Sequence, residues 1–187
     1  MSLSVSNLTI QHGSNRILSD VDLHVPAGQI TGLIGPNGVG KSSLLKSLAA
    51  IAPCSGDVSF EGALVSDAER RDLVAYMPQD SSAGSSLTLT EVVLLGRLKS
   101  LGMRVSPELI LEVQGMLAEF GLEQLSHRTL EAVSGGQRQL AYLAQALFRA
   151  PRILMLDEPT AALDLRHQLV VFETLRKLSE GKNITII

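Results

Sequence analysis

Apolar and polar residues alternate along the first ten positions of the chain, and this period of two predicts a strand. A second strand is predicted over 16–25, where Pro26, Ala27 and Gly28 end it in a turn. The run 30–34 is short, mostly apolar and partly β-branched, which is typical of a strand buried in a parallel sheet. We expect it to lead through a glycine-rich loop into a helix over 42–51.

The segment 80–144 changes to a helical pattern. Thr88 and Glu91 have the spacing of a capping box in front of an apolar run, which predicts a helix start. Ser106 and Pro107 predict the N-cap and the first residue of a second helix. The apolar face of that helix consists of Leu109, Val113, Met116, Leu117 and Phe120, and Gly121 ends it.

Short apolar strands occur on both sides of this helical segment. A further helix is expected over 165–178, with Gly181 as its cap. Because strands and helices alternate, the pattern predicts an α/β core with a mostly parallel sheet. The short strands are expected at 57–60, 73–77, 153–156 and 183–187.

The composition narrows the class of protein. The chain has 187 residues, with 19 acidic against 16 basic side chains, a net charge of −3, two Tyr, four Phe and no Trp. This fits one domain and argues against a nucleic-acid partner, which needs a basic and aromatic surface. The single cysteine, Cys54, excludes an internal disulfide and a structural zinc site. No apolar run approaches the roughly 18 residues that span a bilayer, so we expect a cytoplasmic chain.

A glycine-rich motif follows the run 30–34. Gly35-Pro36-Asn37-Gly38-Val39-Gly40-Lys41-Ser42 fits the P-loop pattern of Gly, four residues and Gly-Lys-Ser, between a predicted strand and a predicted helix. Its glycines let the backbone aim N–H groups at phosphate, Lys41 adds a charge, and the Ser42 hydroxyl can ligate Mg²⁺. A plain glycine-rich turn is the alternative, and a dinucleotide fingerprint fits less well because the third Gly is missing.

Two carboxylates, Asp157 and Glu158, follow the predicted strand 153–156. Ligands bind at the carboxyl ends of parallel strands, so both side chains are expected at a site. Asp157 can hold Mg²⁺ through water, and Glu158 can act as general base on the attacking water. A solvated acidic turn would be preferred for this pair alone, but the P-loop makes that alternative weaker.

A second phosphate-seeking segment lies at the end of the helical part. Ser134 is a natural N-cap, and Gly135 and Gly136 would then form an anion-binding nest at the helix start. With one P-loop already present, this nest is expected to serve the nucleotide of another subunit. The apolar face of the helix consists of Leu140, Leu143, Ala144, Leu147 and Phe148.

These motifs occur in an order that resembles the nucleotide-binding subunit of ATP-binding-cassette (ABC) transporters. The segments are Gly35 to Ser42, Gln79, Ser134-Gly135-Gly136-Gln137, 153–158 and Ala162-Leu163-Asp164. The resemblance covers essentially the whole chain. It implies a P-loop NTPase core with a mostly parallel sheet, an N-terminal antiparallel β portion and a helical insertion. One domain is then expected, with its core at about 1–80 and 145–187 and the helical subdomain at about 81–144.

The resemblance implies ATP and Mg²⁺ as cofactors and gives each motif a role. Glu158 is the catalytic base, and Gln79 reaches both Mg²⁺ and the attacking water. Ser42, Gln79 and Asp157 hold the metal, while Asp164 couples the two sites of a head-to-tail pair. The residues assigned to the nucleotide are Gly35, Pro36, Asn37, Gly38, Val39, Gly40, Lys41, Ser42 and Ser43 of one subunit and Ser134, Gly135, Gly136 and Gln137 of the other.

Two positions depart from the family pattern. His12 stands where the family commonly has an aromatic residue on the adenine; an imidazole can stack there with less area, and a solvated surface role is the alternative. The family also has a histidine after the last strand that contacts the γ-phosphate, and the chain ends at Ile187 before such a residue. We therefore expect a C-terminally truncated cassette with impaired hydrolysis.

The segment 87–97 looks like that of importers for iron-siderophores, haem or cobalamin, although as chemistry it is an amphipathic helix start that could equally pack in a core. We expect a Mg-dependent ATPase subunit of such an importer, working as a homodimer or cassette pair. It would lie on the inner face of the cell membrane beside integral permease subunits and, indirectly, a substrate-binding protein. The alternatives are a soluble ABC ATPase without a transport role and a truncated module that binds ATP without useful turnover.

Overall fold

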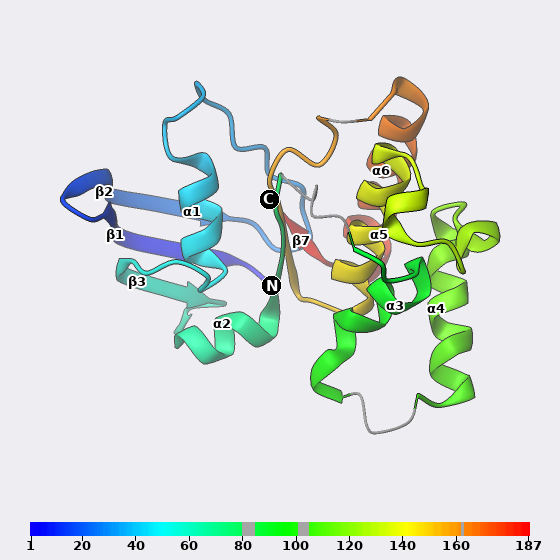
Figure 1. Cartoon of the computed structure of the whole chain (residues 1–187). Coiled ribbons are helices and arrows are strands. Elements are labelled where there is room, and N and C mark those ends of the chain that lie inside the picture. The colour runs from blue at the N-terminus through cyan, green and yellow to red at the C-terminus, as the bar shows by residue number, and fades with distance from the viewer. Residues whose placement is uncertain (80–84, 101–104, 162) are drawn as a thin grey trace. The chain divides into compact units, whose positions relative to one another are not determined.

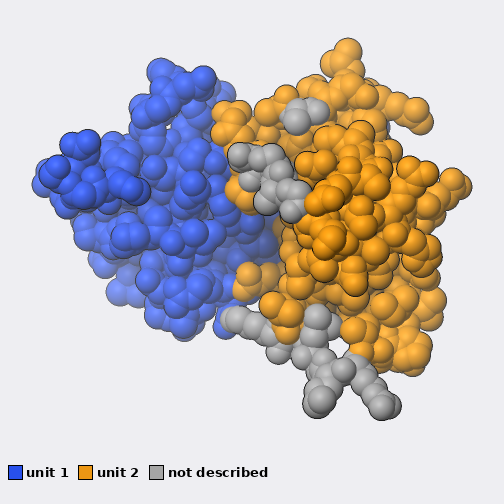
Figure 2. All heavy atoms as spheres, viewed as in Figure 1, with its two compact units in different colours: residues 1–76, 151–157, 173–187 blue, residues 77–150, 158–172 orange. Residues whose placement is uncertain are grey.

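The computed structural model describes residues 1–79, 85–100, 105–161 and 163–187 (Figure 1), so Ala162 and parts of the predicted helical segment lie outside the described residues. The chain divides into two compact units (Figure 2). Unit 1 contains residues 1–76, 151–157 and 173–187, and unit 2 contains residues 77–150 and 158–172. Within the described ranges, no helix is long and apolar enough to cross a membrane.

Unit 1 begins with an antiparallel sheet in the order β2-β1-β3-β4. The strands are β1 (Leu3–His12), β2 (Asn15–Val25), β3 (Ser55–Phe60) and β4 (Ala63–Leu64). Buried positions alternate along β1 but change phase between Val5 and Leu8, where the pairing is irregular and Asn7 has a φ of 52°. The predicted N-terminal strand is therefore confirmed, with a change of phase after Val5 that the alternation did not indicate.

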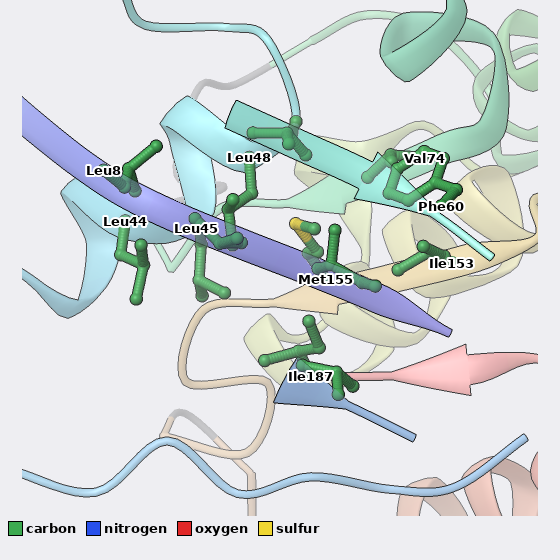
Figure 3. Packing of buried hydrophobic residues seen from close by; sticks show 14 of the residues in the cluster. Leu8, Leu44, Leu45, Leu48, Phe60, Val74, Ile153, Met155 and Ile187 are labelled. Carbon is green, nitrogen blue, oxygen red and sulfur yellow. The ribbon is translucent and has the colours of Figure 1, made fainter. Parts of the chain in front are cut away.

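The core of unit 1 forms where helix α1 (Lys41–Leu48) packs on this sheet (Figure 3). Leu44, Leu45 and Leu48 from α1 lie in one cluster with Leu8 from β1. A second short helix, α2 (Asp67–Leu73), starts with a capping box between Ser66 and Glu69. Its buried Arg70 donates from Nη1 to the carbonyl of Ser47 at 2.8 Å, which ties α2 to the end of α1.

A three-stranded sheet in the order β5-β6-β7 completes unit 1. Its strands are β5 (Val74–Met77), β6 (Ile153–Leu156) and β7 (Thr185–Ile186). All four residues of β6 are buried, and β6 pairs with β7 in parallel. The predictions of a buried strand over 153–156 and of parallel pairing are confirmed.

The expectation for the run 30–34 is wrong in part. Parallel pairing with β7 exists, because the Thr31 N–H donates to the Ile186 carbonyl at 2.8 Å, but Ile30 forms only an isolated bridge. Ile30 is 52% exposed and Ile34 is 95% exposed. Hydrogen bonding to the sheet stops at Thr31, and beyond it Leu33 is still partly buried against the core of unit 1, whereas Ile34 is not. Apolar character indicated burial for the whole run, but only part of the run packs on the core.

Helix α6 (Leu165–Lys182) runs further than the sequence predicted. Gly181 lies inside the helix and does not cap it. Asn183 instead adopts the left-handed conformation, with a φ of 53°, and the Ile184 N–H donates to the Leu178 carbonyl at 3.3 Å. Asparagine is the residue that most often replaces glycine at this position, so the helix end moves two residues along the chain.

Unit 2 is helical in its described residues. Two helix starts agree with prediction. Thr88 and Glu91 form a capping box, in which the Thr88 N–H donates to the Glu91 carboxylate at 2.7 Å. Ser106 caps the helix that begins at Pro107. Val113 and Leu117 are fully buried on the predicted face of that helix. The helical elements are α3 (Leu89–Leu94), η1 (Leu95–Ser100), α4 (Pro107–Glu119), η2 (Glu123–Leu125), η3 (Leu130–Ala132) and α5 (Gly135–Phe148).

The segment 87–97 packs into unit 2. Helix α3 buries Leu89, Val92, Val93 and Leu94, and α3 lies against α5. Arg97, which follows in η1, donates to the Phe148 carbonyl at 2.8 Å and lies over the Phe148 ring at 4.3 Å. The apolar residues of α3 in this segment are therefore core residues of unit 2.

Candidate functional site

The P-loop (residues 35–42) joins the run 30–34 to α1. Gly38 and Gly40 have φ angles of 80° and 106°, a region that favours glycine. Gly40 is the N-cap of α1, and a Cβ placed on it would lie 2.9 Å from Ile17 Cγ2. These two glycines therefore allow the loop to turn sharply onto the start of a helix, where unpaired N–H groups can bind an anion.

The Lys41 side chain folds over its own loop. Its Nζ donates to the carbonyls of Gly35 and Pro36, at 2.8 and 2.9 Å. Ser42 and Ser43 are half-buried in the first turn of α1, while residues 35–39 are exposed. The ammonium charge thus lies at the loop without an acidic partner among these contacts, and it can exchange the two carbonyls for phosphate oxygens.

Asp157 lies directly after β6, at the edge where ligands of parallel sheets bind. It is 6% exposed, and its Oδ2 accepts a hydrogen bond from the Tyr76 hydroxyl at 3.2 Å. Tyr76 comes from β5, the neighbouring strand. Burial, and then the adjacent Asp157 carboxylate, raise the pKa of Tyr76 above its ordinary value, so the phenol stays a donor at neutral pH.

Glu158 has a different environment although it is the next residue. Its side chain is exposed and accepts a hydrogen bond from Gln79 Nε2 at 2.6 Å. Its backbone has a φ of 52°, which is uncommon for glutamate. The Glu158 carbonyl accepts bonds from the Ala161 N–H at 3.2 Å and from Gln139 Nε2 at 3.5 Å. The structure therefore brings together the two predicted catalytic side chains, Gln79 and Glu158.

Ser134 caps α5 as predicted. Its Oγ accepts the Gln137 N–H at 3.2 Å, and the Gln137 Oε1 accepts the Ser134 N–H at 3.0 Å, which completes a capping box. Gly135 and Gly136 form the first turn of the helix. The Ser134 hydroxyl and the Gln137 amide therefore support their own helix, and each keeps hydrogen atoms that can be donated to a ligand.

The predicted residues fall into two groups. Unit 1 contains the P-loop, Ser43, Asp157 and His12, which is exposed at the end of β1 and paired with Asn15. Unit 2 contains Gln79, Glu158, the Ser134 to Gln137 segment and Asp164, which precedes α6.

Three polar residues at the site were missed by sequence reasoning. Tyr76 and Gln139 lie within otherwise apolar stretches of β5 and α5, and Gln139 is only 4% exposed. A polar side chain among buried positions is the signal that could have found them. His167 bonds to Asp164, and only its spacing of three residues at a helix start could have indicated that.

Comparison with known proteins identifies the family. The family model described as ABC transporter matches residues 18–161. This chain belongs to the ABC transporter family. Membership implies an ATP-binding domain, and the predicted α/β fold with a P-loop NTPase core, an antiparallel β portion and a helical insertion is confirmed.

Two curated relatives of this chain are named as ATP-binding proteins of import systems. It is 38% identical to the iron(3+)-hydroxamate import ATP-binding protein FhuC of Bacillus subtilis, an alignment that covers 100% of this chain and 71% of that protein. It is also 38% identical to the hemin import ATP-binding protein HmuV of Pseudomonas entomophila, over 99% of this chain and 76% of that protein.

Solved ABC structures share the fold. A nucleotide-free ATP-binding cassette from an ABC transporter is 25% identical and superposes with a TM-score of 0.88, covering 100% of this chain and 80% of that one. A dimeric cassette in a post-hydrolysis state, bound to ADP and Pi, is 27% identical with a TM-score of 0.84, over 98% of this chain and 85% of that one.

Proposed function

We propose that this chain is the ATP-binding and ATP-hydrolysing subunit that energises an ABC importer of a metal chelate such as an iron-siderophore, haem or cobalamin. The observation that carries the catalytic part is the 2.6 Å contact between Gln79 and Glu158. The cargo class is supported by the import roles in the relatives' names. The chain acts as one domain, with its core at about 1–80 and 145–187 and a helical subdomain at about 81–144.

The triphosphate of ATP is held by the P-loop. The N–H groups of the loop and of the first turn of α1 donate to phosphate oxygens, and Lys41 moves from the carbonyls of Gly35 and Pro36 to the β- and γ-phosphates. Ser43 contributes from the same turn, and His12 stacks on the adenine. Lys41 thus supplies the point charge of the site, and the glycines supply close backbone approach.

Ser42, Asp157 and Gln79 offer hydroxyl, carboxylate and amide oxygens, which are the ligand types that Mg²⁺ takes. In the part of the chain that the structure describes, no group of three or more His, Cys, Asp or Glu side chains could hold a metal ion. Mg²⁺ is commonly held by one or two carboxylates together with phosphate oxygens, and Asp157 would supply the carboxylate. When bound, the ion neutralises charge that develops on the phosphates.

Glu158 is the base of hydrolysis. Its carboxylate accepts a proton from the water that attacks the γ-phosphorus, while the bond from that phosphorus to the β–γ bridging oxygen breaks. General-base catalysis of this kind contributes about 10²–10⁴-fold in rate. Gln79 donates one amide hydrogen to Glu158 and keeps its amide oxygen for the water or the metal.

Two cassettes act together in this proposal. The segment Ser134 to Gln137 of one subunit contacts the γ-phosphate bound by the other, and Asp164 couples the two sites. The pair lies on the inner face of the cell membrane against integral permease subunits, which receive cargo from a substrate-binding protein.

The decisive experiment compares Glu158→Gln with a matched control, Glu131→Gln, at an exposed position in the same unit. Glu158→Gln is expected to bind ATP like the parent and to lose at least about 10²-fold in turnover. Glu131→Gln is expected to retain both. Full turnover in Glu158→Gln would remove this residue as the base.

The importer role is tested in vesicles that contain a metal-chelate permease. Adding the parent chain is expected to give ATP-dependent uptake of the chelate, and Glu158→Gln is not. ATP hydrolysis without binding to such vesicles would favour a soluble ATPase, and ATP binding without hydrolysis would favour a binding module.

A further inference from the structure

His167 has no role in the proposed function, yet it makes two bonds to a residue that does. Its ring Nδ1 lies 2.7 Å from Asp164 Oδ1, and its backbone N–H donates to the same oxygen at 2.9 Å. The backbone and ring of His167 lower the pKa of the Asp164 carboxyl below its ordinary value, with a smaller effect from the Arg166 backbone. Two contacts from one residue therefore orient the Asp164 carboxylate.

The turn before α6 is closed by further bonds on its other side. Gln168 Nε2 donates to the carbonyls of Leu163 and Thr160, at 3.1 and 3.4 Å. The Leu163 N–H also donates to the Thr160 carbonyl at 3.1 Å. The backbone of the turn is thus held by Gln168, and the carboxylate of Asp164 is held by His167.

The same turn lies against the start of α5. A Cβ placed on Gly136 would lie 3.2 Å from Leu163 Cδ2 and 3.8 Å from His167 Nδ1. Gly136 belongs to the first turn of α5, where Ser134 and Gln137 form the capping box. The ring of His167 therefore contacts the Asp164 carboxylate and also lies beside the segment that is proposed to face a second nucleotide.

We propose that His167 is a positioning residue that holds Asp164 in one orientation and keeps its turn packed on the start of α5, so that both are presented together to a second cassette. This inference rests on the proposed function, in which Asp164 and the Ser134 to Gln137 segment face a partner subunit. His167 touches no nucleotide in this role. Its loss therefore weakens the association of two chains and leaves ATP binding by one chain unchanged.

The test uses the Glu158→Gln chain as parent, because slow hydrolysis preserves an ATP-bound pair. The variants are His167→Ala, which removes the ring, and His167→Asn, whose amide nitrogen can replace Nδ1. His127→Ala is the matched control, since His127 is exposed in the same unit. Sedimentation with Mg-ATP measures the dimer dissociation constant, and calorimetry measures the ATP affinity of the dilute chain.

His167→Ala is expected to raise the dimer dissociation constant about fivefold or more, with an unchanged ATP affinity. His167→Asn and His127→Ala are expected to stay within about twofold of the parent. A dimer constant for His167→Ala equal to that of the parent would overturn the proposal. So would a His167→Asn variant that is as impaired as His167→Ala, because the hydrogen bond would then not be the cause.

A parent chain that never dimerises would contradict the proposed function, and a separate measurement then decides the role of His167. Carboxyl NMR titration of Asp164 in the single chain is expected to show its pKa rising part of the way toward the ordinary value in His167→Ala, because the variant loses the ring but keeps the backbone N–H that lowers the pKa most. An unchanged Asp164 titration in that variant would show that the ring of His167 does not orient the carboxylate.

Discussion

Replacing Tyr76 with Phe removes one hydroxyl and keeps the aromatic ring, so it isolates the bond from β5 to Asp157. That hydroxyl donates to Asp157 Oδ2 at 3.2 Å, and Asp157 is 6% exposed. A hydrogen bond to a charged group contributes about 1.5–3 kcal/mol. Because Tyr76 itself is only half-buried, water can replace part of the bond, and we expect the free energy of unfolding to fall by about 1.5 kcal/mol. For a chain of this size that lowers Tm by about 3–6 °C.

The same substitution has a pH signature. The pKa of Tyr76 is raised in the folded state by burial and by Asp157, so folding favours the protonated phenol. The stabilising contribution of Tyr76 is therefore complete below the ordinary tyrosine pKa of about 10 and is lost as the pH rises above it. The Tyr76→Phe variant has no phenol at this position, so its stability lacks this pH dependence. The Tm difference between the parent and the variant is expected to be constant from about pH 7 to 9 and to shrink above about pH 10.

Thermal unfolding followed by circular dichroism across this pH range measures both effects. Tyr142→Phe is the matched control, because Tyr142 is also half-buried but lies on α5. Equal Tm values for the parent and Tyr76→Phe at neutral pH would refute the assignment of the bond. A difference that persists unchanged above pH 10 would refute the raised pKa.

Two further predictions follow from the backbone and the P-loop. Gly56→Ala is expected to cost about 2 kcal/mol or more in urea unfolding, because Gly56 has a φ of 105° and a new Cβ would lie 2.5 Å from the Asn7 carbonyl oxygen. Gly115→Ala is the control, because Gly115 lies in α4 with open space around it, and it is expected to raise the free energy of unfolding by about 0.5–1 kcal/mol. A Gly115→Ala variant as destabilised as Gly56→Ala would show that the close contact at Gly56 is not the cause. Lys41→Ala is expected to weaken ATP binding by about tenfold or more in calorimetry, whereas Lys46→Ala, exposed at the other end of α1, is expected to bind like the parent; equal affinities in both would refute the P-loop assignment.

Local chemistry made much of the fold predictable. The capping pairs Thr88 with Glu91 and Ser134 with Gln137 lie three residues apart, so their geometry depends only on a helix starting there. The buried strand before Asp157 could be predicted for a similar reason, since four apolar residues in a row have few other uses. In each case the residues that determine the local structure lie within a few positions of one another in the sequence.

Features that depend on distant neighbours were not predictable. Ile34 looked like a core residue, yet it is 95% exposed because sheet pairing stops at Thr31. The bond from Tyr76 to Asp157 joins residues 81 positions apart, so the sequence around Tyr76 can mark it as unusual but does not identify its partner. The end of α6 at Asn183 instead of Gly181 depends on a choice between two residues that both tolerate the left-handed region.

Asp157 and Glu158 show why the site needed the structure although its residues could be named from sequence. A regular strand would simply point two consecutive side chains to opposite faces. Here the backbone turns between them: Asp157 ends buried against Tyr76, and Glu158 adopts a φ of 52° with its side chain exposed to Gln79. That conformation costs about 1–2 kcal/mol for a residue with a Cβ, and the bonds to the Glu158 carbonyl from Ala161 and Gln139 offset it. The break in local preference thus separates a buried carboxylate suited to a metal from an exposed one suited to a proton, which is the division of roles that hydrolysis requires.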